Sequence, residues 1–182
     1  MGIFDFEKLS IFRFFEEISA VPRVSYNTAP LAEYLVRFAA ERNLEYVRDG
    51  ADNVIIYKSA TDGYGDRPTL ILQGHTDMVG VVAHGHEHDF SKSGITLVRE
   101  GDILRANGTT LGADNGTALA YMLAILDAHD LEHPALECVF TSNEEVGLLG
   151  AAALDGTALR GRLMINLDSD GEGSFVVGCV GA

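Results

Sequence analysis

Apolar segments of strand length alternate with amphipathic helical segments along most of the chain, and this alternation limits the folds that it can adopt. Several apolar segments lack the polar residues of a half-solvated strand, as expected for strands covered by helices on both faces. Alternating strands and helices predict a layered α/β domain, with a mixed, mostly parallel sheet flanked by helices. The predicted strands are residues 53–57, 69–73, 136–141, 163–167 and 174–180.

Helices are predicted where apolar residues recur with helical spacing, and we assign these stripes to core packing. A short fourth helix, rich in alanine, is predicted at residues 148–154, and residues 95–104 predict a β-hairpin that turns at residues 100–102. The three longer helical stripes run through residues 11–18, 31–38 and 119–126.

Composition excludes several classes of function. The 182 residues suffice for one domain with a sizeable core, and a hydrophobic content of 47% is ordinary for a globular protein. The formal net charge of −14, without a basic cluster, argues against a nucleic-acid partner. No apolar run reaches the ~20 residues that span a bilayer, and residues 1–7 lack the features of a signal peptide. We therefore expect a cytoplasmic protein without a membrane partner.

The two cysteines, Cys138 and Cys179, both lie in apolar strand-like runs. So few cysteines in a chain of this length argue against a disulfide scaffold. We expect two buried, reduced thiols that pack as small hydrophobic groups.

Four acidic motifs stand at the ends of predicted strands or at the start of a predicted helix. In open α/β sheets, functional sites gather outside the carboxyl ends of the strands, so the motifs are expected to converge on one cleft. Singly, each motif also fits an ordinary turn, helix cap or surface loop, and it is their ordered placement that favours a site. The motifs are Gly74-His75-Thr76-Asp77, Gly112-Ala113-Asp114-Asn115-Gly116, Asn143-Glu144-Glu145 and Asp168-Ser169-Asp170.

The residue types in these motifs indicate a metal site. One histidine with several carboxylates suits Zn²⁺, with Mn²⁺ or Co²⁺ as alternatives. Carboxylates gathered in one place repel one another unless cations lie between them. Two metal ions ~3.5–4 Å apart, bridged by a carboxylate, satisfy this requirement and form a hydrolytic site. Asp114, in a glycine-flanked turn, has the freedom that a bridging ligand needs.

The remaining acidic residues have separable roles. Glu144 and Glu145 are adjacent, so on an extended chain their side chains point in opposite directions. One of them can hold a metal ion, and the other can act as the general base. Asp77 lies two residues after His75, where it can orient the imidazole as metal-binding histidines require.

Three longer segments resemble the aminoacyl-histidine dipeptidase family, also called peptidase D or Xaa-His dipeptidase. This family belongs to the co-catalytic zinc exopeptidases. The segments are residues 73–79, 107–116 and 141–147, in that order, and the glycine-rich string around Asp114 is the most specific of them. Shorter similarities extend the resemblance over nearly the whole chain, at residues 21–25, 88–90, 166–168 and 178–181.

The resemblance implies four metal ligands and two catalytic residues. It implies metal-dependent hydrolysis of small dipeptides, of the Xaa-His type, with two Zn²⁺ ions per complete site. His75 and Asp168 would bind one zinc ion, Asp114 would bridge both, and Glu145 would bind the second. Glu144 would be the general base and Asp77 would support His75. The resemblance also implies a cis peptide bond between Asp114 and Asn115, and a homodimer for the full-length protein.

Members of this family are much longer than 182 residues. The resemblance places residues 1–182 in the N-terminal part of the catalytic domain, without the lid domain or the C-terminal part of the catalytic domain. A histidine ligand of the second zinc ion would come from that C-terminal part. Because zinc prefers three or four protein ligands, we expect this chain alone to be weakly active or inactive.

Two other functions stay open on the sequence. One is an amidohydrolase of the same wider group, acting on N-acyl amino acids. The other is a non-catalytic domain that retains the fold. The run of His84, His86 and His88 is a separate feature of the sequence. On an extended chain these three side chains could bind a metal ion. We favour an exposed polar loop there, because nothing nearby fixes the ligand geometry.

Overall fold

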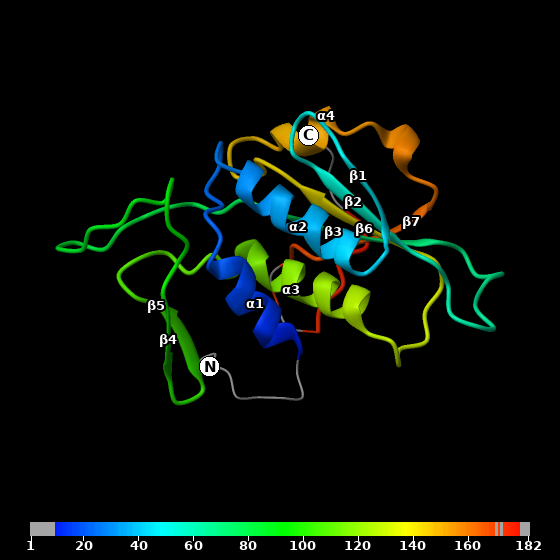
Figure 1. Cartoon of the computed structure of the whole chain (residues 1–182), viewed down its shortest axis with the longest axis horizontal. Helices are drawn as coiled ribbons and strands as arrows, with labels where there is room; N and C mark the ends of the chain where they lie inside the picture. Colours follow the sequence, from blue (N-terminus) through cyan, green and yellow to red (C-terminus); the bar gives the residue numbers. More distant parts are fainter. Residues whose placement is uncertain (1–9, 170, 172, 179–182) are drawn as a thin grey trace.

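A five-stranded sheet organises the fold, which the computed structural model describes for residues 10–169, 171 and 173–178 (Figure 1). Its strands are β1 (Glu45–Arg48), β2 (Val54–Lys58), β3 (Leu70–His75), β6 (Leu136–Thr141) and β7 (Leu163–Asn166). They lie in the order β1-β2-β6-β3-β7. A separate antiparallel hairpin consists of β4 (Leu97–Glu100) and β5 (Ile103–Ala106).

Four of the five strands in the sheet point in the same direction. β3 pairs in parallel with both β6 and β7, whereas β2 pairs antiparallel with both β1 and β6. Only β2 is therefore reversed, and the predicted mixed, mostly parallel α/β sheet is confirmed. The carboxyl ends of β3, β6 and β7 meet at one edge of the sheet, which is where a site is expected in such a fold.

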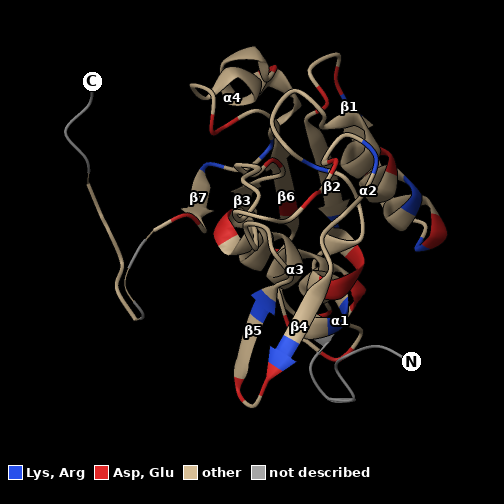
Figure 2. Ribbon diagram, turned by 90° about the vertical axis from the view of Figure 1, so that its left-hand side faces the viewer, with Lys and Arg blue, Asp and Glu red and all other residues tan. Residues whose placement is uncertain are grey.

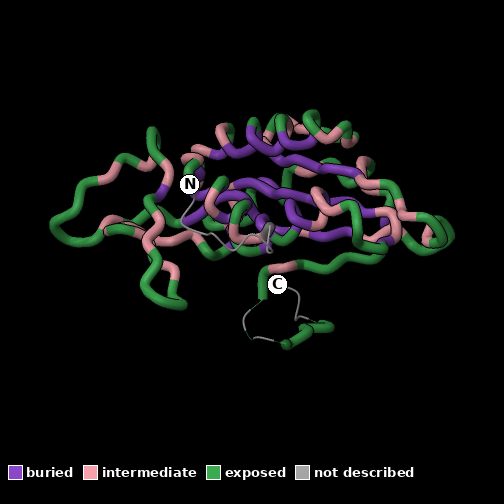
Figure 3. The backbone as a smooth tube through the Cα atoms, turned by 60° about the horizontal axis from the view of Figure 1, so that its bottom comes forward, coloured by how far each residue is buried: buried purple, intermediate pink, exposed green. Residues whose placement is uncertain are grey.

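Three helices cover one face of the sheet: α1 (Ser10–Ser19), α2 (Ala29–Glu41) and α3 (Ala113–Asp127). The segment after the short helix α4 (Leu149–Ala153), which includes the 3₁₀ helix η1 (Gly156–Ala158), covers part of the other face. Figure 3 shows buried backbone through the middle of the domain and exposed residues in its projecting loops. No helix in the described part of the chain has the length and apolar character needed to cross a membrane.

The side chains of β2 show how the strands divide the core. Val54 and Ile56 face the helical layer, whereas Ile55 and Tyr57 face the smaller cluster on the opposite side, and all four are buried. This two-sided burial explains why the first four residues of the strand, 54–57, are all hydrophobic. The central strand β6 is likewise buried along its whole length. Its Cys138 is free and buried, as predicted, and burial raises the pKa of the thiol to about 12.

Shortening a side chain in this core gives a first test of the fold. Ile56 is fully buried, so the Ile56→Val variant is expected to lose about 0.5–1.5 kcal/mol of free energy of unfolding. The matched control is Ile103→Val, because Ile103 is 53% exposed in β5. Urea denaturation measures both. Equal losses in the two variants would contradict the assignment of Ile56 to the core.

The positions predicted for four helices, the hairpin and four strands are confirmed, with ends that differ by a few residues. The prediction of a fifth strand at residues 174–180 is wrong for residues 174–178, which the structure describes and which form no strand. They lead away from the body of the domain in Figures 2 and 3, and Phe175, Val176 and Val177 are exposed. An apolar run becomes a strand only where a neighbouring strand pairs with it. Cys179 lies outside the described residues.

The strand β7 forms one edge of the sheet. It pairs only with β3 among the described residues, and its side chains are exposed along its length. Leu163, Met164 and Ile165 are 57%, 48% and 37% exposed. Such an apolar edge is a surface on which further strands can add.

Candidate metal centre

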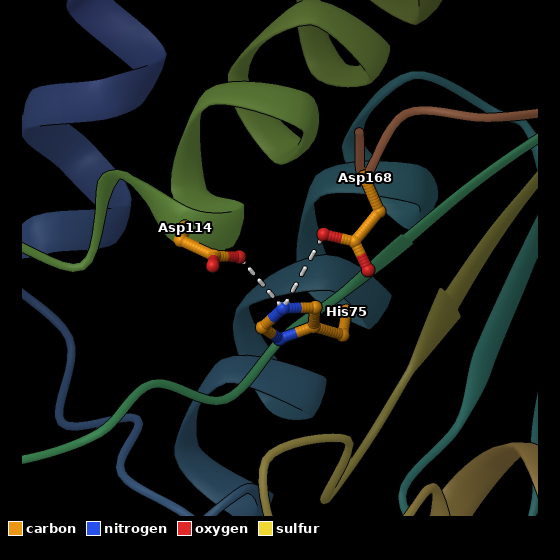
Figure 4. Close-up of side chains that lie close together, drawn as sticks. All are labelled: His75, Asp114 and Asp168. Atoms are coloured by element: carbon orange, nitrogen blue, oxygen red, sulfur yellow. Dashed lines mark hydrogen bonds and ion pairs between the residues drawn. The ribbon is translucent and has the colours of Figure 1, made fainter. Parts of the chain in front are cut away.

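His75 is the last residue of β3 and lies at the centre of the candidate site. Its imidazole is buried, and the carboxylates around it come from other elements (Figure 4). The Nε2 atom lies 3.0 Å from Oδ1 of Asp114, 3.8 Å from Oε2 of Glu144 and 3.9 Å from Oδ1 of Asp168. The motifs predicted to converge therefore lie together, around one ring nitrogen.

The fold explains this convergence. Asp114 stands at the start of α3, Glu144 follows β6, and Asp168 follows β7. The parallel strands β3, β6 and β7 end side by side, so the residues that follow them meet. The peptide bond between Asp114 and Asn115 is cis, as predicted.

The other ring nitrogen of His75 fixes the orientation of the imidazole. Nδ1 lies 3.0 Å from the main-chain carbonyl oxygen of Asp77, which can only accept a hydrogen bond. Nδ1 therefore carries the proton and donates it, which leaves the lone pair of Nε2 for a ligand in the neutral ring. The carboxylate of Asp77, predicted for this role, is farther away, with Oδ1 at 3.5 Å from Nδ1.

The carboxylate of Asp77 also holds the loop after β6. Asp77 is fully buried and accepts a hydrogen bond from the hydroxyl of Ser25 at 2.8 Å. It also accepts from the backbone N–H groups of Glu144 at 2.9 Å and Glu145 at 3.3 Å. Burial by itself would raise the pKa of Asp77, but the contact with His75, followed by the hydrogen bonds from Glu144 and Ser25, lowers it. Asp77 thus links the His75 loop to both glutamates.

Two overlapping groups of side chains have the spacing of a metal site. His75, Asp114 and Asp168 form one group, and His75, Glu144 and Glu145 form the other. Within each group, one ligand atom per residue lies within 4.8 Å of the others. The first group agrees with the ligand set implied for one zinc ion. The second contains Glu145 with Glu144 and His75, where the resemblance implied Glu145 with Asp114.

The charges in the site favour a bound cation. Burial lowers the pKa of His75, but the side chain of Asp77, the charge of Asp168 and the hydrogen bond to the side chain of Asp114 outweigh this and raise the pKa to about 9. The pKa of Glu145 is raised by burial and by the neighbouring carboxylates of Asp114, Glu144 and Asp77. So many carboxylates around one imidazole fit divalent metal ions, whose charge would replace that of a proton on the ring.

Comparison with known proteins assigns the family. The profile described as peptidase family M28 matches residues 53–177, which is more than half of the chain. The chain belongs to peptidase family M28. The cytosol non-specific dipeptidase of Escherichia coli is 41% identical to the chain over 167 residues. These cover 92% of the chain and 34% of the dipeptidase, so the chain spans about a third of the length of this relative.

Solved structures agree with this assignment. A crystal structure of aminoacylhistidine dipeptidase from Vibrio alginolyticus matches the chain with a TM-score of 0.88 and 36% identity. The match covers 94% of the chain and 36% of the Vibrio protein. The aminopeptidase PepT from Bacillus cereus matches with a TM-score of 0.74 and 26% identity, covering 93% and 45% of the two chains. The resemblance to aminoacyl-histidine dipeptidases is confirmed. Both the family and the donor set indicate metal cofactors.

Two residues that contact the loops of the candidate metal centre had no role in the sequence prediction. Arg23 donates hydrogen bonds to main-chain carbonyls close to the candidate ligands His75 and Asp114, and Ser25 donates to Asp77. Both lie in the segment 21–25, whose resemblance to dipeptidases was the only signal for them. The spacing of strands and helices could not reveal them, because they lie in a connection between two helices.

The histidine run at residues 84–88 does not contribute to the candidate metal centre around His75. Residues 83–87 are exposed, and among the described residues no metal-ligand group includes His84, His86 or His88. The His88 ring instead packs edge-on against Phe90, with ring centroids 4.5 Å apart. The exposed polar loop is therefore the interpretation that the structure supports. Asp170, the last residue of the fourth motif, lies outside the described residues.

Proposed function

We propose that the chain forms the N-terminal part of the catalytic domain of a metal-dependent dipeptidase. The observation that carries this proposal is the buried imidazole of His75, whose Nε2 atom faces carboxylates from three separate elements. The substrate is a small dipeptide, of the Xaa-His type, and the reaction is hydrolysis of its peptide bond. The names of both the Vibrio and the Escherichia coli relatives support a dipeptide substrate, and that of the Vibrio protein supports the Xaa-His type.

The donor set fits zinc. It consists of one imidazole and several carboxylates without a thiolate, which is typical of hydrolytic zinc sites. His75, Asp114 and Asp168 would hold one Zn²⁺ ion, while Asp114 and Glu145 would contribute to a second. When bound, the ions polarise the peptide carbonyl and lower the pKa of a water molecule. Mn²⁺ and Co²⁺ are compatible with the same ligands.

Glu144 is the general base of this proposal. Its carboxylate is 29% exposed and lies 3.8 Å from Nε2 of His75, so it borders the metal ligands and is accessible to water. From there it can take a proton from the attacking water and pass it to the leaving amine. The backbone N–H of Glu144 is held by Asp77, which fixes the base relative to His75. Asp77 therefore acts through the positions of its neighbours.

We propose a cytoplasmic location, in line with the name of the Escherichia coli protein. We also propose a homodimer for the complete protein, as the resemblance of the sequence to aminoacyl-histidine dipeptidases implies. The lid domain and the C-terminal part of the catalytic domain would lie outside residues 1–182. The exposed edge at β7 is the surface on which the remaining strands of the catalytic domain would add.

A hydrolysis assay tests the proposal. The isolated chain, given Zn²⁺ and a Xaa-His dipeptide, is expected to show little or no turnover, because residues 1–182 would supply only Asp114 and Glu145 to the second metal ion. Turnover near that of a full-length dipeptidase would contradict this expectation. The complete protein is expected to cleave the dipeptide. Preferential cleavage of an N-acyl amino acid would favour an amidohydrolase, and no cleavage of either substrate would favour a non-catalytic domain.

A further inference from the structure

A charged side chain is buried behind the metal ligands. Arg23 is 2% exposed and lies in the connection between α1 and α2. Its Nη1 atom donates to the carbonyl oxygen of Thr76 at 3.2 Å, and its Nη2 atom donates to the carbonyl oxygen of Gly112 at 2.5 Å. Thr76 directly follows His75, and Gly112 lies two residues before Asp114. One guanidinium group therefore binds the backbone of both ligand loops.

The glycines of the Asp114 motif make room for this guanidinium. A Cβ atom on Gly112 would lie 2.5 Å from Nη2 of Arg23, and one on Gly116 would lie 2.8 Å from the same atom. Gly112 also has a φ of +65°, a conformation that side chains other than glycine rarely adopt. Glycines at positions 112 and 116 are therefore required by the guanidinium of Arg23, in addition to any flexibility that Asp114 requires as a metal ligand.

The residues next to Arg23 contact the other loops of the site. We call residues 23–26 the strap. The carbonyl oxygen of Arg23 accepts from the backbone N–H of Met78 at 3.1 Å, and the Ser25 hydroxyl donates to Asp77. The backbone N–H of Tyr26 donates to Oδ1 of Asn143 at 2.6 Å, where Asn143 directly precedes Glu144. The strap therefore contacts the three loops that carry His75, Asp114 and Glu144.

The charge of Arg23 suits this position. Burial lowers its pKa to about 10, while the nearby carboxylates of Asp77 and Asp114 act in the opposite direction. The side chain is therefore charged at neutral pH. A buried guanidinium needs fixed acceptors, and both of its acceptors are loop carbonyls of the site instead of groups in a helix or strand.

We propose that Arg23 is a positioning residue for the metal centre, holding the His75 and Asp114 loops at the separation that a shared metal ion requires. This inference rests on the proposed metal site. Arg23 contacts neither the reacting atoms nor a metal ion, and acts through the backbone of the two loops. Replacing it is expected to weaken metal binding by about 10–100-fold, the usual cost of losing a partner that orients metal ligands.

Co²⁺ binding by the chain tests this role, because the visible absorption of bound Co²⁺ reports affinity and ligand geometry together. Arg23→Met is expected to weaken Co²⁺ binding and change the absorption bands. Arg42→Met is the matched control: Arg42 binds Asp127 and the carbonyl oxygen of Phe38, outside the site, and its loss changes the net charge equally. It is expected to keep the affinity and spectrum of the wild type. Equal affinities and spectra in all three proteins would overturn the proposal.

Two further measurements separate the possible failures. If Arg23→Met does not fold, Arg23→Lys replaces it, because one ammonium group cannot span both carbonyls as the planar guanidinium does. Wild-type affinity and spectrum in a folded Arg23→Lys variant would overturn the proposal. If the wild-type chain binds no Co²⁺, the proposed metal centre is wrong. Amide hydrogen exchange of Thr76 and Gly116, in the two segments that Arg23 binds, then decides its role in the metal-free chain. Faster exchange of these amides in the variant supports the role, and unchanged exchange overturns it.

Discussion

The Asp114→Ala variant is expected to lose tightly bound Zn²⁺, whereas the Glu144→Ala variant is expected to retain it. Oδ1 of Asp114 lies 3.0 Å from Nε2 of His75, in the ligand group completed by Asp168. Removing a residue that orients a metal ligand typically lowers metal affinity by ~10–100-fold. Removing the proposed ligand itself should lower the Zn²⁺ affinity by more than this. Glu144 is proposed as the base, so its removal leaves the first ligand group complete.

Competition with a chromogenic chelator measures the Zn²⁺ affinity of both variants and the wild type. Asp62→Ala is the control, because Asp62 is an exposed carboxylate in the polar loop before β3 and its loss changes the net charge equally. It is expected to bind Zn²⁺ like the wild type. Equal losses in the Asp114 and Glu144 variants would show that Glu144 is a metal ligand, as the second ligand group allows, and would contradict its assignment as the base.

The Asp77→Ala variant is expected to lose both stability and metal affinity. The buried carboxylate of Asp77 accepts three hydrogen bonds, from Ser25, Glu144 and Glu145. A hydrogen bond to a charged group contributes ~1.5–3 kcal/mol, so losing these should lower the free energy of unfolding by about 3 kcal/mol even after the repulsion from nearby carboxylates is relieved. Metal affinity should also fall, because the loop that carries both glutamates loses its anchor.

Asp89→Ala is the matched control for this variant. Asp89 also accepts hydrogen bonds from a serine hydroxyl and a backbone N–H, both of Ser91, but it lies on the exposed surface. Its loss should have a small effect, because water replaces the lost contacts. Chemical denaturation and chelator competition give the two readouts. Equal stability losses in the Asp77 and Asp89 variants would contradict the structural role of the buried carboxylate.

Burial on both faces made most of the sheet predictable from the sequence. The strands β2 and β6 are apolar at nearly every position because helices or loops cover both of their sides. β1 was not predicted, since the short exposed sequence Glu45-Tyr46-Val47-Arg48 becomes a strand through its pairing with β2. Residues 174–178 show the opposite case, an apolar run without a neighbouring strand. Pairing partners are tertiary information that a local pattern does not contain.

The acidic residues of the site were predictable for a different reason. Each lies in the loop that follows a strand or at a helix start, so the α/β topology alone brings them to one edge of the sheet. The contacts that hold them are less regular. Arg23 would ordinarily be expected at the surface, and only the fold shows that it lies between two ligand loops. The sequence also could not reveal that the carbonyl of Asp77, closer than its carboxylate, orients His75.

We propose that His75, Asp114 and Asp168 form a metal site within this chain. A crystal structure of the chain grown with Zn²⁺, with anomalous diffraction recorded at the zinc absorption edge, tests this site. The predicted result is an anomalous peak in contact with Nε2 of His75 and the carboxylates of Asp114 and Asp168. A peak on the His84, His86 and His88 loop with none beside His75 would contradict the claim, as would the absence of any bound zinc.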